Sequence, residues 1–366
     1  MKVISYLFCV IFSFAFVSCS SVQTKELQRE ALFKVALEVN LKRQKKTWPR
    51  ETTPPYAAEG YIFQGSRSGI FAAFNQKGKE VWRFNVPQGF EAPPLYYQNK
   101  VYVGANDGFF YCLHAHSGRV VWKYQTEYSI LSEPIINNHS IYFLNSQDEL
   151  YALDLESGKW QWHYKRDFKK DRMTIHGSST PLVSHNSLYV GFSDGYFVSL
   201  NSATGALNWI KKLVEGGRFQ DIDSQPVFQG DRVYILTYEG SLYALSSHNG
   251  KVLWKKSIQG GRGFTLQGDV LYVSTLQGEL KAFSSGEGQE LWSWKVKNGS
   301  LTAPVVIDKT VLVGGEKSGL HAVNIKTGKE VWAYKLTFGL SARPFALHDK
   351  IYIFSNGSKL SVLSKK

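Results

Sequence analysis

A tryptophan that stands four residues after a glycine recurs seven times, and this repeat constrains the fold more than any other feature of the sequence. The intervals between these tryptophans are 40, 40, 47, 45, 38 and 40 residues. A period of about 40 to 45 residues built from short strands is typical of a β-propeller, in which each repeat forms one blade. The seven tryptophans are Trp82, Trp122, Trp162, Trp209, Trp254, Trp292 and Trp332.

The unit from residue 134 to residue 164 shows how the sequence encodes one blade. Apolar stretches over 134–136, 141–144, 150–153 and 160–164 are separated by short segments rich in Asn, Asp, Ser and Gly. Four short strands with tight connections predict one antiparallel sheet. In other units a glycine follows an acidic residue, as Gly108 follows Asp107, and supplies the positive φ of a hairpin.

The chain ends within an eighth unit, which begins at Arg343 and stops before a tryptophan. Trp48 precedes the first unit, so we expect an N-terminal strand at Trp48 to complete the last blade and remove the open sheet edge. The prediction is an all-β, eight-bladed propeller of four-stranded antiparallel blades over residues 47–366, closed by N- and C-terminal strands. The alternative is seven blades with flanking strands.

The recurrent tryptophans are interpreted as wedges between neighbouring blades. Each ring would bury about 150–250 Å² of surface, and one tryptophan at a fixed place in every copy suits a structural role. The alternative is a platform for a carbohydrate or a cofactor.

Residues 1–18 are predicted to be a lipoprotein signal peptide. Lys2 precedes a 15-residue apolar run over 3–17, which is short for a membrane span and suits a signal sequence. The run ends at Val17-Ser18-Cys19, which resembles a bacterial lipobox with Phe16 in place of the usual Leu. We therefore expect lipidation of Cys19. The alternatives are an ordinary signal peptide cut nearby or an uncleaved anchor.

Ser20, and not Asp, follows the cysteine, and resemblance to Gram-negative lipoproteins then implies the periplasmic face of the outer membrane. Residues 19–46 are predicted to be a tether with a short helix, because Leu27, Ala31 and Val35 fit one helical face. Alternation from Val35 to Leu41 also fits a strand. The basic stretch over 42–50 is either a solvated linker or a contact with anionic lipid head groups.

The segment Ala-Leu-Asp-Leu-Glu-Ser-Gly-Lys-Trp-Gln-Trp at 152–162 resembles the repeat shared by quinoprotein dehydrogenases and the BamB family of outer-membrane assembly lipoproteins. Two loops, over 173–181 and 218–226, resemble the BamB family more specifically. This resemblance implies that they bind the periplasmic POTRA domains of the insertase BamA. The implied contact residues are Met173, Ile175, His176, Asp221 and Asp223.

His176 stands where the family has Arg, and a neutral imidazole cannot form the bidentate pair of a guanidinium. The other interpretation of these loops is structural: Asp221 and Asp223 cap turns, and Met173 and Ile175 are buried between blades.

Enzymatic functions are not favoured by the residues. The chain lacks the vicinal cysteine pair that resemblance to a quinone-binding propeller would require, and His114 and His116 have no third ligand near them in the sequence. The net charge of +13 favours anionic partners without naming one, and nucleic acid is not expected for an exported lipoprotein.

We therefore expect a scaffold without cofactor or metal. It would be a monomeric subunit of a complex with a BamA-like insertase and other assembly lipoproteins, and would assist the insertion of outer-membrane proteins. The alternative is a propeller that binds a small molecule or glycan in its central channel.

Overall fold

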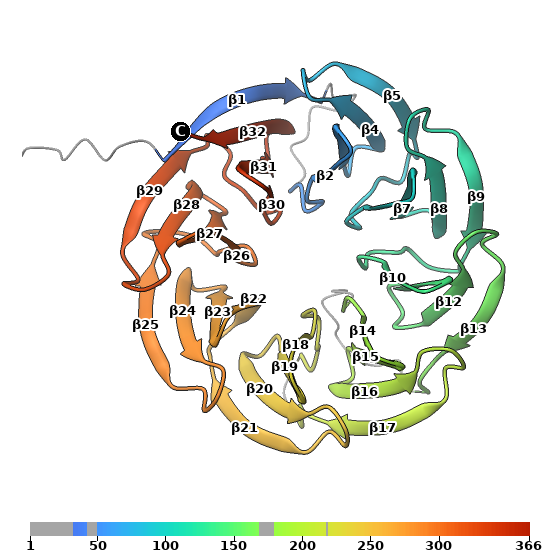
Figure 1. Cartoon of the computed structure of the whole chain (residues 1–366), viewed down its shortest axis with the longest axis vertical. Coiled ribbons are helices and arrows are strands. Elements are labelled where there is room, and N and C mark those ends of the chain that lie inside the picture. Colours follow the sequence, from blue (N-terminus) through green and yellow to red (C-terminus); the bar gives the residue numbers. More distant parts are fainter. Residues whose placement is uncertain (1–31, 42–49, 168–178, 217–218) are drawn as a thin grey trace, which may run out of the picture. The chain divides into compact units, whose positions relative to one another are not determined.

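The computed structural model describes residues 32–41, 50–167, 179–216 and 219–366. These residues form eight four-stranded antiparallel sheets, arranged as blades around a ring (Figure 1). The predicted eight-bladed propeller is confirmed, and the seven-bladed alternative is wrong. Within the described ranges there is no helix of the length and apolarity that a membrane crossing requires.

The first four blades run in chain order, and in each the strands follow one another from the hub to the rim. They comprise β2 (Tyr56–Ala58), β3 (Tyr61–Gly65), β4 (Ile70–Asn75) and β5 (Glu80–Asn85); β6 (Leu95–Tyr97), β7 (Lys100–Gly104), β8 (Phe109–His114) and β9 (Val120–Gln125); β10 (Ile135–Asn137), β11 (Ser140–Leu144), β12 (Leu150–Asp154) and β13 (Trp160–Tyr164); and β14 (Leu182–Ser184), β15 (Ser187–Gly191), β16 (Tyr196–Asn201) and β17 (Leu207–Lys212).

The last four blades repeat this order, except that the outer strand of the eighth comes from the N-terminal part of the chain. They comprise β18 (Val227–Gln229), β19 (Arg232–Leu236), β20 (Ser241–Ser246) and β21 (Val252–Ser257); β22 (Gly261–Gln267), β23 (Val270–Thr275), β24 (Glu279–Ser284) and β25 (Glu290–Lys295); β26 (Val305–Ile307), β27 (Thr310–Gly315), β28 (Gly319–Asn324) and β29 (Glu330–Lys335); and β30 (Phe345–Leu347), β31 (Lys350–Phe354), β32 (Lys359–Lys365) and β1 (Phe33–Asn40).

The strand that completes the eighth blade is β1, which pairs antiparallel with β32 from Phe33 opposite Lys365 to Asn40 opposite Lys359. The short helix expected within residues 19–46 is therefore wrong over 33–40, where the strand interpretation holds. The edge of β32 offers unpaired backbone groups, and pairing with them outweighs a weak helical pattern. The propeller thus begins at β1 and not at residue 47, and Trp48 lies outside the described residues.

Each repeated tryptophan joins its blade to the next at a contact that we call the seam. Trp82 Nε1 donates to the backbone oxygen of Ala115 at 2.7 Å, and its ring lies against Gly118, where a Cβ would come within 2.6 Å of the ring. Five further seams repeat this pairing of glycine with the preceding tryptophan: Gly158 with Trp122, Gly205 with Trp162, Gly250 with Trp209, Gly288 with Trp254, and Gly328 with Trp292.

This geometry explains why glycine and tryptophan recur together. The glycine of each repeat receives the tryptophan of the blade before it, and the tryptophan of the same repeat reaches the blade after it. Since the eighth blade has no tryptophan in this place, Leu37 and Val39 of β1 lie against Gly78, where a Cβ would be 2.5 Å from Leu37 Cδ1. Phe33 packs edge-on against Trp332, with ring centroids 5.2 Å apart, at the other side of that blade.

Two glycines with similar backbones separate the effect of the seam from the effect of backbone strain. Gly158 (φ 67°) lies against Trp122, whereas Gly230 (φ 58°) has no other atom within 4 Å of an added Cβ. Both alanine variants carry the penalty of the left-handed conformation, about 1–2 kcal/mol. We expect Gly158→Ala to lower the free energy of unfolding by about 1–3 kcal/mol more than Gly230→Ala, because the methyl group displaces the ring. Urea denaturation measures both; equal losses would contradict the seam.

Candidate functional site at the hub

The links between blades and the turns between second and third strands lie on one face of the ring, because turns alternate between the ends of an antiparallel sheet. We call this the linker face. Backbone hydrogen bonds join its parts: the amide of Tyr238, in the turn after β19, donates to the oxygen of Asp221, in the link before β18, at 3.0 Å. The other turns lie on the opposite face. The candidate contact residues Asp221 and Asp223 therefore belong to the linker face.

A serine or threonine hydroxyl fastens several of the links to their own blades. The Ser132 hydroxyl accepts from the amide of Leu144 at 2.8 Å and donates to its carbonyl at 3.0 Å, and Ser224 makes the same two bonds with Leu236. Thr302 accepts from the amide of Gly314 at 2.8 Å. The residues on either side of this anchor consequently face the axis of the ring.

Residues from all eight blades line one cavity of about 260 Å³ at the hub. Its charged lining residues are Glu91, Glu133, Asp223, Arg262 and Arg343. Arg343 Nη2 lies 2.6 Å from Glu133 Oε2 and joins the eighth blade to the third, which are not neighbours in the ring. A second cavity of about 440 Å³, with Tyr96 and Ile136 in its wall, also contacts Glu133. The acids of the first cavity are thus mixed with arginines.

The two predicted aspartates differ in their surroundings. Asp221 is 1% exposed, so its carboxylate is not presented to a partner. Asp223 is half-buried in the wall of the hub cavity, where burial raises its pKa to about 6 and the charge of Arg262 acts in the opposite direction. Of the pair, only Asp223 is placed to contact another molecule directly. The other predicted contact residues, Met173, Ile175 and His176, lie outside the described residues.

Two further buried aspartates lie beside Asp221 and were missed by sequence reasoning. Asp148, in the turn after β11, accepts hydrogen bonds from the amide of Ser193 at 2.8 Å and from its hydroxyl. Asp194, in the turn after β15, pairs with Arg166 Nε at 3.0 Å. Burial raises the pKa of Asp148 to about 6, and the nearby charges of Asp194 and Asp221 add to the effect. The sequence shows these aspartates in equivalent turns between second and third strands, but they were interpreted only as residues that favour a turn.

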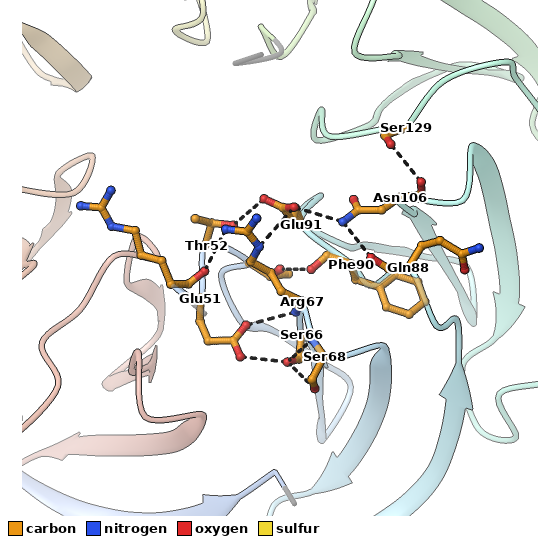
Figure 2. Close-up of polar contacts among 12 residues, drawn as sticks. Glu51, Thr52, Ser66, Arg67, Ser68, Gln88, Phe90, Glu91, Asn106 and Ser129 are labelled. Carbon is orange, nitrogen blue, oxygen red and sulfur yellow. Dashed lines mark hydrogen bonds and ion pairs between the residues drawn. The ribbon is translucent and has the colours of Figure 1, made fainter. Parts of the chain in front are cut away.

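Where the chain enters the first blade, fully buried Glu51 holds the two ends of the ring together. Its carboxylate accepts hydrogen bonds from Ser66 Oγ at 2.9 Å and the amide of Arg67 at 3.2 Å, both in the first blade (Figure 2). It also accepts from Ser358 Oγ, in the eighth blade, at 2.8 Å. The ring is therefore closed at the hub as well as at the rim.

A chain of polar contacts continues from this point into the next two blades (Figure 2). Glu91 accepts hydrogen bonds from Thr52 Oγ1 at 3.4 Å and Asn106 Nδ2 at 3.0 Å, and pairs with Arg67 Nε at 3.3 Å. Ser129 Oγ donates to the oxygen of Asn106 at 2.9 Å. These contacts hold Arg67 and Glu91 in place at the mouth of the hub.

The architecture defines an eight-bladed propeller of the tryptophan-repeat type with a polar, partly ion-paired hub. A model of the family described as "Outer membrane protein assembly factor BamB" matches residues 34–127, 69–293 and 276–366. The chain therefore belongs to the BamB family, as the sequence resemblance predicted.

Individual relatives agree with this assignment. BamB of Legionella pneumophila (strain Paris) is 27% identical over 201 residues, 52% of each chain, and BamB of Escherichia coli K12 is 24% identical over 189 residues, 50% of this chain and 48% of that one. The chain thus spans about half the length of the curated relatives it matches. The crystal structure of BamB from Moraxella catarrhalis superposes with a TM-score of 0.78 at 20% identity, covering 91% of this chain and 99% of that one.

The propeller is also shared with enzymes. Quinohemoprotein alcohol dehydrogenase from Comamonas testosteroni superposes with a TM-score of 0.76 at 13% identity, covering 92% of this chain and 77% of that one, which shows the fold alone. The hub described here does not fit a quinone with calcium: no three His, Cys, Asp or Glu side chains in the described part of the chain are grouped to hold a metal ion, and Arg262 and Arg343 share the cavity wall.

The buried carboxyl of Asp148 predicts a pH-dependent term in stability. A carboxyl whose pKa rises from 3.8 to about 6 on folding binds more protons in the folded state, so its stabilising effect is complete below about pH 4 and is lost as the pH rises past about 6. Asp148→Asn keeps the shape and removes the titration. We expect the free energy of unfolding of the wild type, minus that of the variant, to fall by about 1–3 kcal/mol between about pH 4 and 7. A constant difference in urea melts would contradict this.

Proposed function

We propose that the chain is a non-enzymatic scaffold of outer-membrane protein assembly that binds the POTRA domains of a BamA-like insertase through its linker face. Membership of the BamB family supports this role. The observation that carries it is the position of Asp223, a half-buried carboxyl in a link between blades, in a segment that resembles the BamB contact loop. The chain would then act by recognising a protein surface, and not by catalysing a reaction in a pocket.

Within this proposal Asp221 and Asp223 have different roles. Asp223 lines the hub cavity and would accept hydrogen bonds from donors of the partner. Asp221 is buried and receives the amide of Tyr238 on its backbone oxygen, so it would position the link. Replacing Asp221 by Lys would bury an unpaired charge at a cost of about 3–5 kcal/mol, and loss of binding by that variant would report unfolding.

Asp223→Lys is therefore the informative variant, and Asp231→Lys is its control. Asp231 lies in the same blade on the opposite face, with its side chain 86% exposed, so both changes reverse one charge. We expect Asp223→Lys to weaken binding to the purified POTRA domains of the insertase by about tenfold, because it places like charges together in the interface. Binding can be measured by calorimetry on the full chain.

The control should bind within about twofold of the wild type, since its charge lies outside the proposed contact. Thermal melts of both variants establish that they are folded. Equal affinities for a folded Asp223→Lys variant and the wild type would remove Asp223 from the interface.

We further propose that Cys19 carries the lipid that anchors the chain at the periplasmic face of the outer membrane. Two or more acyl chains hold a protein firmly, since each buried methylene contributes about 0.8 kcal/mol. Cys19→Ser should lose palmitate labelling and appear in the soluble periplasmic fraction, whereas Cys112→Ala, at the buried cysteine, should keep both label and membrane attachment. Unchanged labelling of Cys19→Ser would exclude this anchor.

A further inference from the structure

Three exposed arginines gather at the mouth of the hub on the linker face. Arg50 enters the first blade, Arg67 lies in the turn between β3 and β4, and Arg262 lies within β22 of the sixth blade. The side chains of Arg50 and Arg67 are 50% and 39% exposed. Residues far apart in the sequence therefore present guanidinium groups to the solvent at one place, which we call the arginine site.

Contacts with the scaffold hold the first two arginines in position. Arg67 Nη1 donates to the backbone oxygen of Arg50 at 3.4 Å, and Arg67 Nε lies 3.3 Å from Glu91 Oε1 (Figure 2). Arg50 forms an ion pair with Glu316 of the seventh blade. A guanidinium has five N–H donors, and these contacts leave donors directed to the solvent. The site is thus preorganised without being saturated.

Arg262 adds a third charge close to the other two. It lines the hub cavity together with Thr52 and Glu91, which themselves form the contacts around Arg67. Burial lowers the pKa of Arg50, and the nearby charges of Arg262 and Arg67 add to this effect. Like charges held this close repel one another, and an anionic group placed among them would relieve the repulsion.

The remainder of the linker face indicates what kind of anion fits. Among the residues that the structure describes, exposed or half-buried acids predominate over the second to fifth blades, and they include Asp107, Glu127, Glu133, Glu215, Asp223 and Glu239. Exposed cations predominate over the sixth to eighth and first blades, and besides the arginine site they include Lys297, Lys317 and Lys335. The described part of the linker face is therefore divided into an acidic half and a basic half.

We propose that Arg50, Arg67 and Arg262 form a docking site for an acidic segment of a polypeptide partner. The planar forks of arginine can pair with carboxylates in two parallel hydrogen bonds, and Arg67 and Arg50 already form ion pairs with the carboxylates of Glu91 and Glu316 on the scaffold side. A uniformly anionic lipid surface would meet repulsion from the acidic half of the same face, whereas a polypeptide can present its acids to the arginines alone. This proposal extends the proposed function and does not depend on Asp223.

A labelled oligoglutamate peptide tests the site by fluorescence anisotropy at low salt. The protein is the full chain carrying Cys19→Ser, so that no acyl anchor contributes. We expect the triple variant Arg50→Gln, Arg67→Gln and Arg262→Gln to raise the dissociation constant about tenfold or more, because it removes the three positioned charges. Binding by the unmodified site should weaken steeply as salt is added.

A matched triple variant on the opposite face removes the same formal charge: Arg119→Gln, Lys251→Gln and Lys326→Gln, all at exposed residues. It should bind the peptide within about twofold of the parent chain. Equal weakening by the two triple variants would overturn the proposal, since net charge and not a site would then explain binding.

Two further measurements complete the test: one with a single-residue variant and one with lipid vesicles. Arg262→Glu alone leaves the Glu91 and Glu316 pairs intact and should also weaken binding, so a folding defect in the triple variant does not obscure the result. Vesicles of phosphatidylcholine with phosphatidylglycerol test the lipid alternative. Vesicle binding that depends on the three arginines, without peptide binding, would overturn the polypeptide assignment.

Discussion

The contact on which the structure depends is the packing of one tryptophan ring on the glycine of the next blade. A four-stranded blade cannot bury both of its faces alone, and stacking blades in a ring buries them. The ring of Trp82 reaches Gly118 because no side chain is there, and the indole N–H donates to the backbone oxygen of Ala115, three residues before that glycine. Repeated along the chain, this contact sets the angle between neighbouring blades. The eighth blade shows that shape matters more than the residue type, because Leu37 and Val39 fill the same place against Gly78.

A ring of blades must be closed between the first and last parts of the chain, and this chain makes two separate contacts that close it. At the rim, β1 adds the outer strand to a blade whose other strands come from the C-terminus. At the hub, buried Glu51 bonds to Ser358 on one side and to Ser66 on the other. The strand pairing of β1 and the hydrogen bonds of Glu51 lie at the two ends of one short stretch of chain. Separation of the first and eighth blades would therefore break the strand pairing and also leave the buried carboxylate of Glu51 without its donors. Both losses raise the free energy of the open ring. The closed ring in turn brings eight links to one axis.

Much of this could be predicted from the sequence, and the exceptions share a cause. The blade period and the four strands of residues 134–164 follow from local patterns, since neighbouring strands are also neighbours in sequence. The strand at 33–40 was only the alternative to a predicted helix, because its pattern suits both and its partner β32 lies more than 300 residues away. The ion pair at the hub was missed for the same reason: Glu133 and Arg343 are 210 residues apart in the sequence, and no local spacing indicates their contact. The different exposure of Asp221 and Asp223, which are two residues apart, likewise depends on how the assembled ring buries each side chain.

The division of the linker face into halves follows from the same long-range assembly. In the sequence the excess of positive charge has no evident location, because acids and bases alternate in every repeat. The ring separates them. In the acidic half, Arg166 pairs with the carboxylate of Asp194 and Lys212 donates to the backbone oxygen of Asp194, whereas Arg262 is exposed in the basic half. A face with two signs orients a partner that carries the opposite arrangement and repels one that is reversed, and it does so before any close contact forms. Orientation of this kind requires only that the charges be held in fixed positions, and a closed propeller holds them.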